Sequence, residues 1–243
     1  MIALVTGGNR GLGKAICIYL AKKNIDIAFT YNSHKEEAKE TLEFIRDNYN
    51  IRTHAFKCDI SCEEEVEKMI NKVLDLYGCI DVLVNNAGIC NDSLLFDKTY
   101  SDFKKILDVN LIGTFLVSKY VGKIMISQKK GNIINISSNN AIDSYYPESC
   151  DYDASKAGVI SLTYNLAKEF APFVRVNCIC PGWIKTDMNK DLSLQQVADA
   201  KEKILLKRFA EPEEVAKVVY FLISPAASYV NSSIIKVDGG KLN

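Results

Sequence analysis

A tyrosine and a lysine four residues apart carry the clearest chemistry in this chain. Tyr152 and Lys156 lie in the run YDASK, at the start of a helix-period segment, so both side chains are expected on one face of a helix. A tyrosine has a reference pKa of about 10 and is a poor base at neutral pH. A nearby ammonium favours the phenolate and makes the hydroxyl usable in proton transfer. Because the pair follows a predicted strand that ends in Ser137 and Ser138, we expect a proton-transfer site at the end of that strand.

A glycine-rich turn is the second chemical feature. The run TGGNRGLG, residues 6–13, lies between the strand-like run Ile2–Val5 and a helical segment. Gly7, Gly11 and Gly13 permit a tight turn and let backbone N–H groups approach a pyrophosphate, which the positive end of the following helix also attracts. The spacing GxxxGxG differs from the GxGxxG of the common dinucleotide fingerprint. The position of the turn between a strand and a helix predicts a dinucleotide site.

Apolar runs of strand length alternate with helix-period segments along the chain. This alternation predicts right-handed βαβ units in an α/β fold: one Rossmann-type, doubly wound parallel sheet of about seven strands, with helices on both faces, in a single domain over residues 1–243. The expected strands are Ile2–Val5, Ile25–Thr30, Thr53–Cys58, Ile80–Val84, Ile133–Ile136, Val174–Ile179 and Ile234–Val237, and the expected helices lie near 12–23, 35–48, 62–77, 101–127, 152–171 and 212–222.

Two local features qualify this pattern. Ser33 with Glu36 and Ser61 with Glu64 have the spacing of capping boxes and are expected to begin two helices. Residues 187–207 stand outside the alternation, polar first and then helix-like. An excursion beyond the carboxyl end of a strand suits a substrate lid, and a plain surface helix is the alternative.

Composition limits the partners. The 30 Lys and Arg residues balance 30 Asp and Glu residues, which argues against a nucleic acid or an anionic membrane held by charge. No run approaches the roughly 18 apolar residues of a membrane span, and the first strand follows Met1 directly, without room for a signal peptide. The eight cysteines are scattered, with no CxxC pair, so we expect free thiols, no metal and a cytoplasmic protein.

Taken in order, the motifs resemble those of the short-chain dehydrogenase/reductase family. After the glycine turn come Asp59 in CDIS, NNAG at 85–88, VNLIGTF around Asn110, ISS at 136–138, YDASK at 152–156 and PGWIKTDM at 181–188. The length, the glycine turn and the closing VDGG at 237–240 look most like the 3-oxoacyl-(acyl-carrier-protein) reductases of that family.

The resemblance implies roles for the matching residues. Ser138 would hold the substrate oxygen, Tyr152 would donate the proton, and Lys156 would lower the pKa of Tyr152 and hold the nicotinamide ribose. Asn110 would bend its helix and steady a water that connects to the lysine. The residues expected around a nicotinamide dinucleotide are Gly7, Asn9, Arg10, Gly11, Leu12, Gly13, Tyr31, Asn32, Ser33, Asp59, Ile60, Asn86, Ala87, Gly88, Tyr152, Lys156, Pro181, Gly182, Ile184 and Thr186.

The end of the second strand bears on the choice of cofactor. Tyr31 stands at about the position where NAD-dependent members of the family carry an acid. Because an acid there would repel a 2′-phosphate, its absence favours NADP(H), with NAD(H) not excluded. Arg10 is expected to bind the 2′-phosphate by charge-assisted hydrogen bonds. Asn32, Ser33 or Lys35 can serve there too; the alternative is that Ser33 merely caps a helix and Lys35 is a solvated charge.

These observations predict an NADPH-dependent reductase of a carbonyl, most readily of a 3-oxoacyl thioester carried by acyl carrier protein or coenzyme A. Action on a sugar, a steroid or another small alcohol is the alternative. A non-enzymatic cofactor sensor is disfavoured because all four catalytic positions are occupied. The resemblance also implies a homotetramer built on the helices near 101–127 and 152–171, and Lys129 with Lys130 is a candidate basic patch for a carrier protein.

Overall fold

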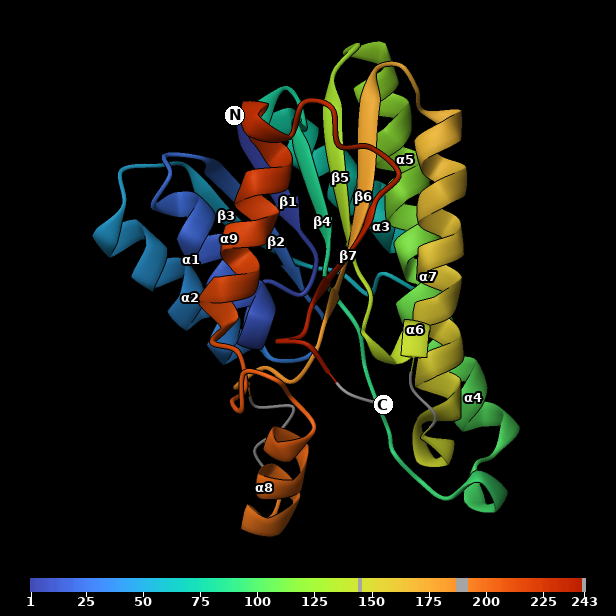
Figure 1. The fold of residues 1–243 in the computed structure, drawn as a ribbon. Helices are drawn as coiled ribbons and strands as arrows, with labels where there is room; N and C mark the ends of the chain where they lie inside the picture. Colours follow the sequence, from blue (N-terminus) through green and yellow to red (C-terminus); the bar gives the residue numbers. More distant parts are fainter. Residues whose placement is uncertain (144–145, 187–191, 242–243) are drawn as a thin grey trace.

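Seven parallel strands form one sheet in the order β3-β2-β1-β4-β5-β6-β7 (Figure 1). The computed structural model describes residues 1–143, 146–186 and 192–241. The strand order reverses between β1 and β4, as in doubly wound sheets, so the expected fold class is confirmed. The strands are β1 (Ile2–Val5), β2 (Asp26–Tyr31), β3 (Thr53–Lys57), β4 (Val82–Asn85), β5 (Gly131–Ile136), β6 (Val174–Pro181) and β7 (Ile234–Val237).

Helices cover both faces of this sheet. Figure 1 shows α1, α2 and α9 on one face and α3, α5 and α7 on the other. The short α4 and the helix α8 lie at the end of the molecule where the strands end. The helices are α1 (Gly11–Ala21), α2 (Lys35–Asn48), α3 (Glu63–Tyr77), α4 (Tyr100–Leu107), α5 (Gly113–Ser127), α6 (Asn140–Asp143), α7 (Cys150–Glu169), α8 (Leu194–Glu202) and α9 (Pro212–Ile223).

The strands are continuously apolar because both of their faces are covered. All four residues of β1 are buried. Ala3 and Val5 pack in the cluster beneath α1 and α9, whereas Ile2 and Leu4 pack in the cluster beneath α3 and α5. This alternation is the period of two expected of a strand, with hydrophobic residues in both phases.

Buried polar side chains join the central strands to the helices of one face. Asn85 on β4 donates to Ser118 on α5 and to Asn135 on β5, both at 2.8 Å. Asn135 in turn donates to Thr163 on α7 at 2.9 Å. Because a buried amide without partners is costly, these bonds fix how α5 and α7 lie against the strands that lead into the site.

The long helix expected over 101–127 is interrupted. Between α4 and α5 the π-helical turn η2 (Asp108–Ile112) surrounds the buried Asn110, and Thr114 Oγ1 donates to the Asn110 carbonyl oxygen at 2.8 Å. By length and hydropathy the whole stretch Tyr100–Ser127 is the one candidate membrane span among the described residues, and half of its most apolar window is buried in the protein. Core helices of soluble proteins meet the same criterion.

Both expected capping boxes are wrong. The residue before α2 is His34, and the Ser33 hydroxyl lies 3.0 Å from the His34 ring Nδ1. The residue before α3 is Cys62, and the Ser61 hydroxyl donates backward to Asp59 at 2.6 Å. In each case the helix begins one residue later than the capping pattern requires, because the serine is engaged by a neighbour.

The excursion expected over 187–207 contains a helix. Residues 187–191 lie outside the described residues, and α8 begins with a capping box between Ser193 and Gln196. Figure 1 shows α8 beyond the carboxyl end of the sheet. At its base the ring of Trp183 stacks on that of Phe209, with centroids 5.4 Å apart.

Candidate active site

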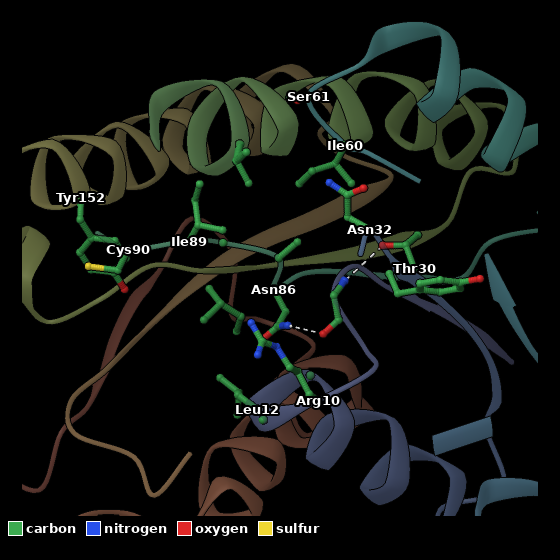
Figure 2. Close-up of a pocket in the computed structure, with 18 of the residues that line it drawn as sticks. Arg10, Leu12, Thr30, Asn32, Ile60, Ser61, Asn86, Ile89, Cys90 and Tyr152 are labelled. Atoms are coloured by element: carbon green, nitrogen blue, oxygen red, sulfur yellow. Dashed lines mark hydrogen bonds between the residues drawn. The ribbon is translucent and has the colours of Figure 1, made fainter. Parts of the chain in front are cut away.

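A cavity of about 960 Å³ runs along the carboxyl ends of the strands. It crosses the reversal of strand order between β1 and β4, where doubly wound sheets bind ligands. Every residue expected around the dinucleotide lines it, and so does Ser138. Figure 2 shows Tyr152 and Cys90 at one end and Asn32 and Ile60 at the other.

The glycine turn forms a cradle that side chains would fill. Gly7 and Gly11 have φ angles of 64° and 52°, in the left-handed region that glycine adopts without strain. A Cβ at Gly13 would lie 2.1 Å from the Gly7 carbonyl oxygen. The N–H groups of the first turn of α1 point out of its amino end, where the helix dipole favours an anion. The turn therefore fits a pyrophosphate.

Asn86 holds this turn together. Its side-chain amide donates to the carbonyl oxygens of Thr6 and Gly7 at 3.0 and 3.1 Å, the second of which is drawn in Figure 2. The Thr6 hydroxyl accepts the N–H groups of Asn86 and Ala87, each at 3.0 Å. Although Asn86 lines the cavity, its side chain shapes the glycine turn, and the expected contact to a ribose stays a prediction.

The far end of the cavity is lined by residues that suit the adenosine half of a dinucleotide. Tyr31, Asn32 and Ser33 follow one another at the end of β2, and Arg10 stands exposed at the amino end of α1. One carboxylate oxygen of Asp59 accepts the backbone N–H and the hydroxyl of Ser61. These bonds fix the orientation of the Asp59 carboxylate.

Ser138 and Tyr152 meet at the other end. A hydrogen bond joins the Ser138 hydroxyl to the side chain of Tyr152, and the Ser138 hydroxyl accepts the N–H of Asn140 at 3.2 Å. Its neighbour Ser137 also lines the cavity, and its hydroxyl donates to the carbonyl oxygen of Lys156 at 2.8 Å.

Burial raises the pKa of Tyr152 above its usual value, and the hydrogen bond from Ser138 opposes this only in part. The Lys156 ammonium lies 5.6 Å from the ring centroid, and the expectation that it lowers the pKa of Tyr152 stays a prediction. The hydroxyl stays protonated at neutral pH, as a proton donor requires.

The burial of Lys156 is unfavourable for its positive charge. Its side chain enters the interior of the protein, where its ammonium donates to the carbonyl oxygen of Ile136 at 2.9 Å. Burial lowers its pKa from 10.5 to about 8. A Cβ at Gly88 would lie 3.3 Å from Lys156 Nζ, so the glycine of NNAG keeps this space open.

Asn110 lies behind the cavity rather than in its wall. Its amide accepts the N–H of Ile89 at 2.8 Å and donates to the Ile89 carbonyl oxygen at 2.9 Å and to Ser155 Oγ at 3.0 Å. The helix distortion expected at Asn110 is present as the π-helical turn. Asn110 thus holds the segment after β4 against α7, and the proton path through a water stays a prediction.

Several residues that line the cavity were not predicted from the sequence. His34 follows Ser33 directly, and Cys90 lies two residues beyond NNAG, so proximity to a motif was the available signal. A further group comes from α4 and η2, whose approach to the cavity no local pattern reveals: Ser101, Lys104, Lys105, Asp108 and Val109. The remaining ones stand next to predicted motifs at the ends of the strands: Thr30, Cys58, Ser61, Ile89, Ile136 and Ser137.

No cluster of three or more potential metal ligands occurs among the described residues. All eight cysteines are free thiols, as expected. Cys178 and Cys180 lie with their sulfurs 4.0 Å apart on β6.

Known proteins resemble the chain over nearly its whole length. The family model described as "Enoyl-(Acyl carrier protein) reductase" matches residues 7–241. The 3-oxoacyl-[acyl-carrier-protein] reductase FabG of Aquifex aeolicus is 42% identical over 240 residues, which cover 98% of this chain and 96% of that protein. The 3-oxoacyl-[acyl-carrier-protein] reductase of Synechocystis is 39% identical over 241 residues, with the same coverage.

Solved structures also resemble the chain over nearly its whole length. A dehydrogenase/reductase from Sinorhizobium meliloti superposes with a TM-score of 0.92 at 32% identity, over 98% of this chain and 94% of that one. A short-chain dehydrogenase/reductase mutant from Serratia marcescens has the same TM-score at 29% identity, over 98% and 96%.

The chain belongs to the short-chain dehydrogenase/reductase family. It is therefore an oxidoreductase whose cofactor is a nicotinamide dinucleotide. Within that family, the two curated relatives compared above are 3-oxoacyl-(acyl-carrier-protein) reductases.

We predict that Lys156→Met increases stability at neutral pH. Because the pKa of Lys156 falls from 10.5 to about 8 on folding, the unfolded chain binds the proton more tightly, and this costs the folded protein up to about 3 kcal/mol below pH 8. The cost disappears as pH rises through 10.5, so the advantage of the variant shrinks between pH 8 and 10. Chemical unfolding of wild type and variant at several pH values measures this difference.

Lys168→Met, at an exposed position of the same helix, is the matched control and should change stability little at any pH. A Lys156→Met variant that is less stable than wild type at pH 7 would show that the contacts of the lysine outweigh the cost of its burial.

Proposed function

We propose that this protein is an NADPH-dependent reductase of 3-oxoacyl thioesters. The observation that carries the proposal is the hydrogen-bonded pair of hydroxyls, Ser138 and Tyr152, at one end of a cavity whose other end fits a dinucleotide. Two neighbouring hydroxyls that can each donate a hydrogen bond suit a carbonyl oxygen that becomes an alkoxide. The two curated relatives, named for the same reaction, support the choice of substrate.

The residues have the following roles. A bound nicotinamide dinucleotide supplies the hydride. Ser138 and Tyr152 bind the carbonyl oxygen, and as the carbonyl carbon accepts the hydride, Tyr152 transfers its proton to the oxygen to give the 3-hydroxy product. Lys156, with a pKa of about 8, holds a proton close enough to stabilise the tyrosinate left behind.

The preference for NADPH rests on the adenosine end of the cavity. The four residues after Thr30 are Tyr31, Asn32, Ser33 and His34, and all four line the cavity without a carboxylate. Arg10 adds a permanent positive charge at the same rim. A 2′-phosphate would gain charge-assisted hydrogen bonds there and meet no repulsion from the end of β2.

The candidate basic patch, Lys129 with Lys130, lies in an unsuitable place for docking a carrier protein. Lys130 precedes β5 at the amino edge of the sheet and pairs with Asp81 at 3.0 Å. The cavity opens at the carboxyl edge, so a carrier docked at Lys129 and Lys130 would deliver its acyl group to the wrong end of the strands. Delivery on an acyl carrier protein remains part of the proposal without this patch.

Assembly and location are proposed on the same basis. The outer side of η2 and α5 exposes Ile112 and Phe115, and α7 exposes Tyr164, all about half accessible. These are the helices expected at the subunit contacts, and apolar surface there fits a homotetramer. Eight free thiols fit a reducing cytoplasm.

We predict that the protein oxidises NADPH with acetoacetyl-CoA and with a carrier-bound 3-oxoacyl chain, and that Tyr152→Phe lowers kcat about 10²–10⁴-fold, because the variant lacks the proton donor. Loss of NADPH absorbance is the measurement, with crotonyl-CoA, sugars and steroid ketones as competing substrates. The matched control is Tyr229→Phe at a fully exposed tyrosine.

Turnover of none of the 3-oxoacyl thioesters would refute the proposed substrate class. Full activity of Tyr152→Phe would refute the assignment of the proton donor.

We also predict that Arg10→Ala raises the KM for NADPH about tenfold or more, while the KM for NADH stays unchanged, because only NADPH carries the 2′-phosphate. Lys22→Ala, at the other end of α1, serves as the control for general loss of positive charge. Equal effects on both cofactors, or a wild type that prefers NADH, would contradict the role of Arg10.

A further inference from the structure

A buried ion pair lies directly beside the proposed proton donor. The Lys98 ammonium is 3.0 Å from Asp151 Oδ1 and 3.1 Å from Oδ2, and the two side chains are 3% and 0% exposed. No other ion pair found among the described residues has both partners buried. Removing two charges from water costs about as much as their pairing returns, so stability alone does not explain this pair.

The pair connects two segments that meet at the cavity. Lys98 follows the 3₁₀ turn η1 (Leu95–Asp97), and its ammonium also donates to the backbone carbonyl oxygen of Asn91 at 2.8 Å. Asp151 stands in the first turn of α7, where its Oδ1 accepts the backbone N–H of Tyr152 at 2.9 Å. One ammonium therefore ties the chain at Asn91 to the turn that carries Tyr152.

The segment tied in this way forms the wall that faces Tyr152. Ile89 and Cys90 line the cavity, and Figure 2 shows Cys90 beside Tyr152. A backbone hydrogen bond of 3.1 Å from Ser93 to Glu148 joins the same two segments a little further out. The width of the cavity at Tyr152 thus depends on contacts between these segments.

The pair also balances charge in this wall. Burial is the main cause of the raised pKa of the Cys90 thiol. The charges of the pair also act on it, because Asp151 raises this pKa and Lys98 lowers it. The groups that face Tyr152 are Cys90 and Asp92 from the segment after β4, Ser138 from the end of β5, and Asp153 and Lys156 from α7 itself. The pair of Lys98 and Asp151 adjoins this set through the backbone N–H of Tyr152, so loss of either partner would leave one uncompensated charge beside it.

We propose that Lys98, acting through Asp151, is a positioning residue for Tyr152. Its ammonium holds the first turn of α7 against the segment Ile89–Ser93 and cancels the charge of the carboxylate next to the proton donor. The inference depends on the proposed function only for the role of Tyr152 in proton transfer, and any carbonyl compound that the wild type reduces can serve as the substrate.

Three variants test this: Lys98→Met, Asp151→Asn and the double variant Lys98→Met/Asp151→Asn. The double variant removes both charges with side chains of similar size, so it leaves no uncompensated buried charge. Lys119→Met is the matched control, because Lys119 pairs with Glu63 over 2.9 Å with both side chains half exposed. Thermal unfolding, KM and the pH dependence of kcat are measured for each.

We expect the two single variants to shift the alkaline limb of kcat in opposite directions. Lys98→Met leaves a negative charge near Tyr152 and moves the limb to higher pH, whereas Asp151→Asn leaves a positive charge and moves it to lower pH, each by about 0.5–1 pH unit. The double variant should keep the wild-type limb and thermal stability, with kcat about tenfold lower and KM little changed, because Tyr152 is no longer held in place.

A double variant with the kcat of the wild type would overturn the proposal, since the pair would then serve stability alone. If the two single variants shift the alkaline limb in the same direction, or do not shift it, the proposed charge balance beside Tyr152 is wrong. A double variant that does not fold would show that the pair is needed for folding and would refute a role confined to positioning. If the wild type reduces another carbonyl compound but no thioester, the proposed function fails while this test still applies.

Discussion

The site depends on the burial of one ammonium at the end of β5. Lys156 donates to the carbonyl oxygen of Ile136, and its pKa falls to about 8 because burial removes most of the water around its ammonium. Much of the surrounding structure serves this placement. Ser137 binds the lysine backbone and Gly88 leaves room for its ammonium. The π-helical turn holds Asn110, whose Oδ1 also lies 3.3 Å from the position that a Cβ of Gly88 would take. Stability is lost locally so that a proton can be held beside Tyr152, and the large core offsets that loss.

The remaining geometry follows from the parallel sheet. All strands end on the same side, so the glycine turn, the end of β2, NNAG and the serine pair come together although they are far apart in the sequence. The bonds from Asn85 to Asn135 and on to Thr163 set α7 against β5. This placement lets Ser138 reach Tyr152. In the proposed reaction, cofactor and substrate would meet at one end of a cavity whose opposite end suits adenosine.

The sequence was sufficient for the strands, their order along the chain and those cavity residues that belong to motifs, because buried parallel strands are continuously apolar and the motifs follow them directly. It was insufficient where tertiary contacts override a local pattern. Ser33 and Ser61 have the spacing of helix caps but bond to His34 and Asp59. The π-helical turn and the pair of Lys98 with Asp151 join residues whose proximity no periodicity encodes. The sign of the pKa shift of Tyr152 depended on burial, which only the folded structure reveals.

In the proposed complex, one hydroxyl pair receives the carbonyl oxygen while a dinucleotide extends toward Arg10. The most direct measurement is a crystal structure of the Tyr152→Phe variant with NADP⁺ and a 3-oxoacyl thioester. The account predicts the carbonyl oxygen within hydrogen-bonding distance of Ser138 Oγ, the ring of residue 152 directly beside it, and the 2′-phosphate against Arg10. A carbonyl bound away from Ser138, or an adenosine end directed away from Arg10, would contradict it.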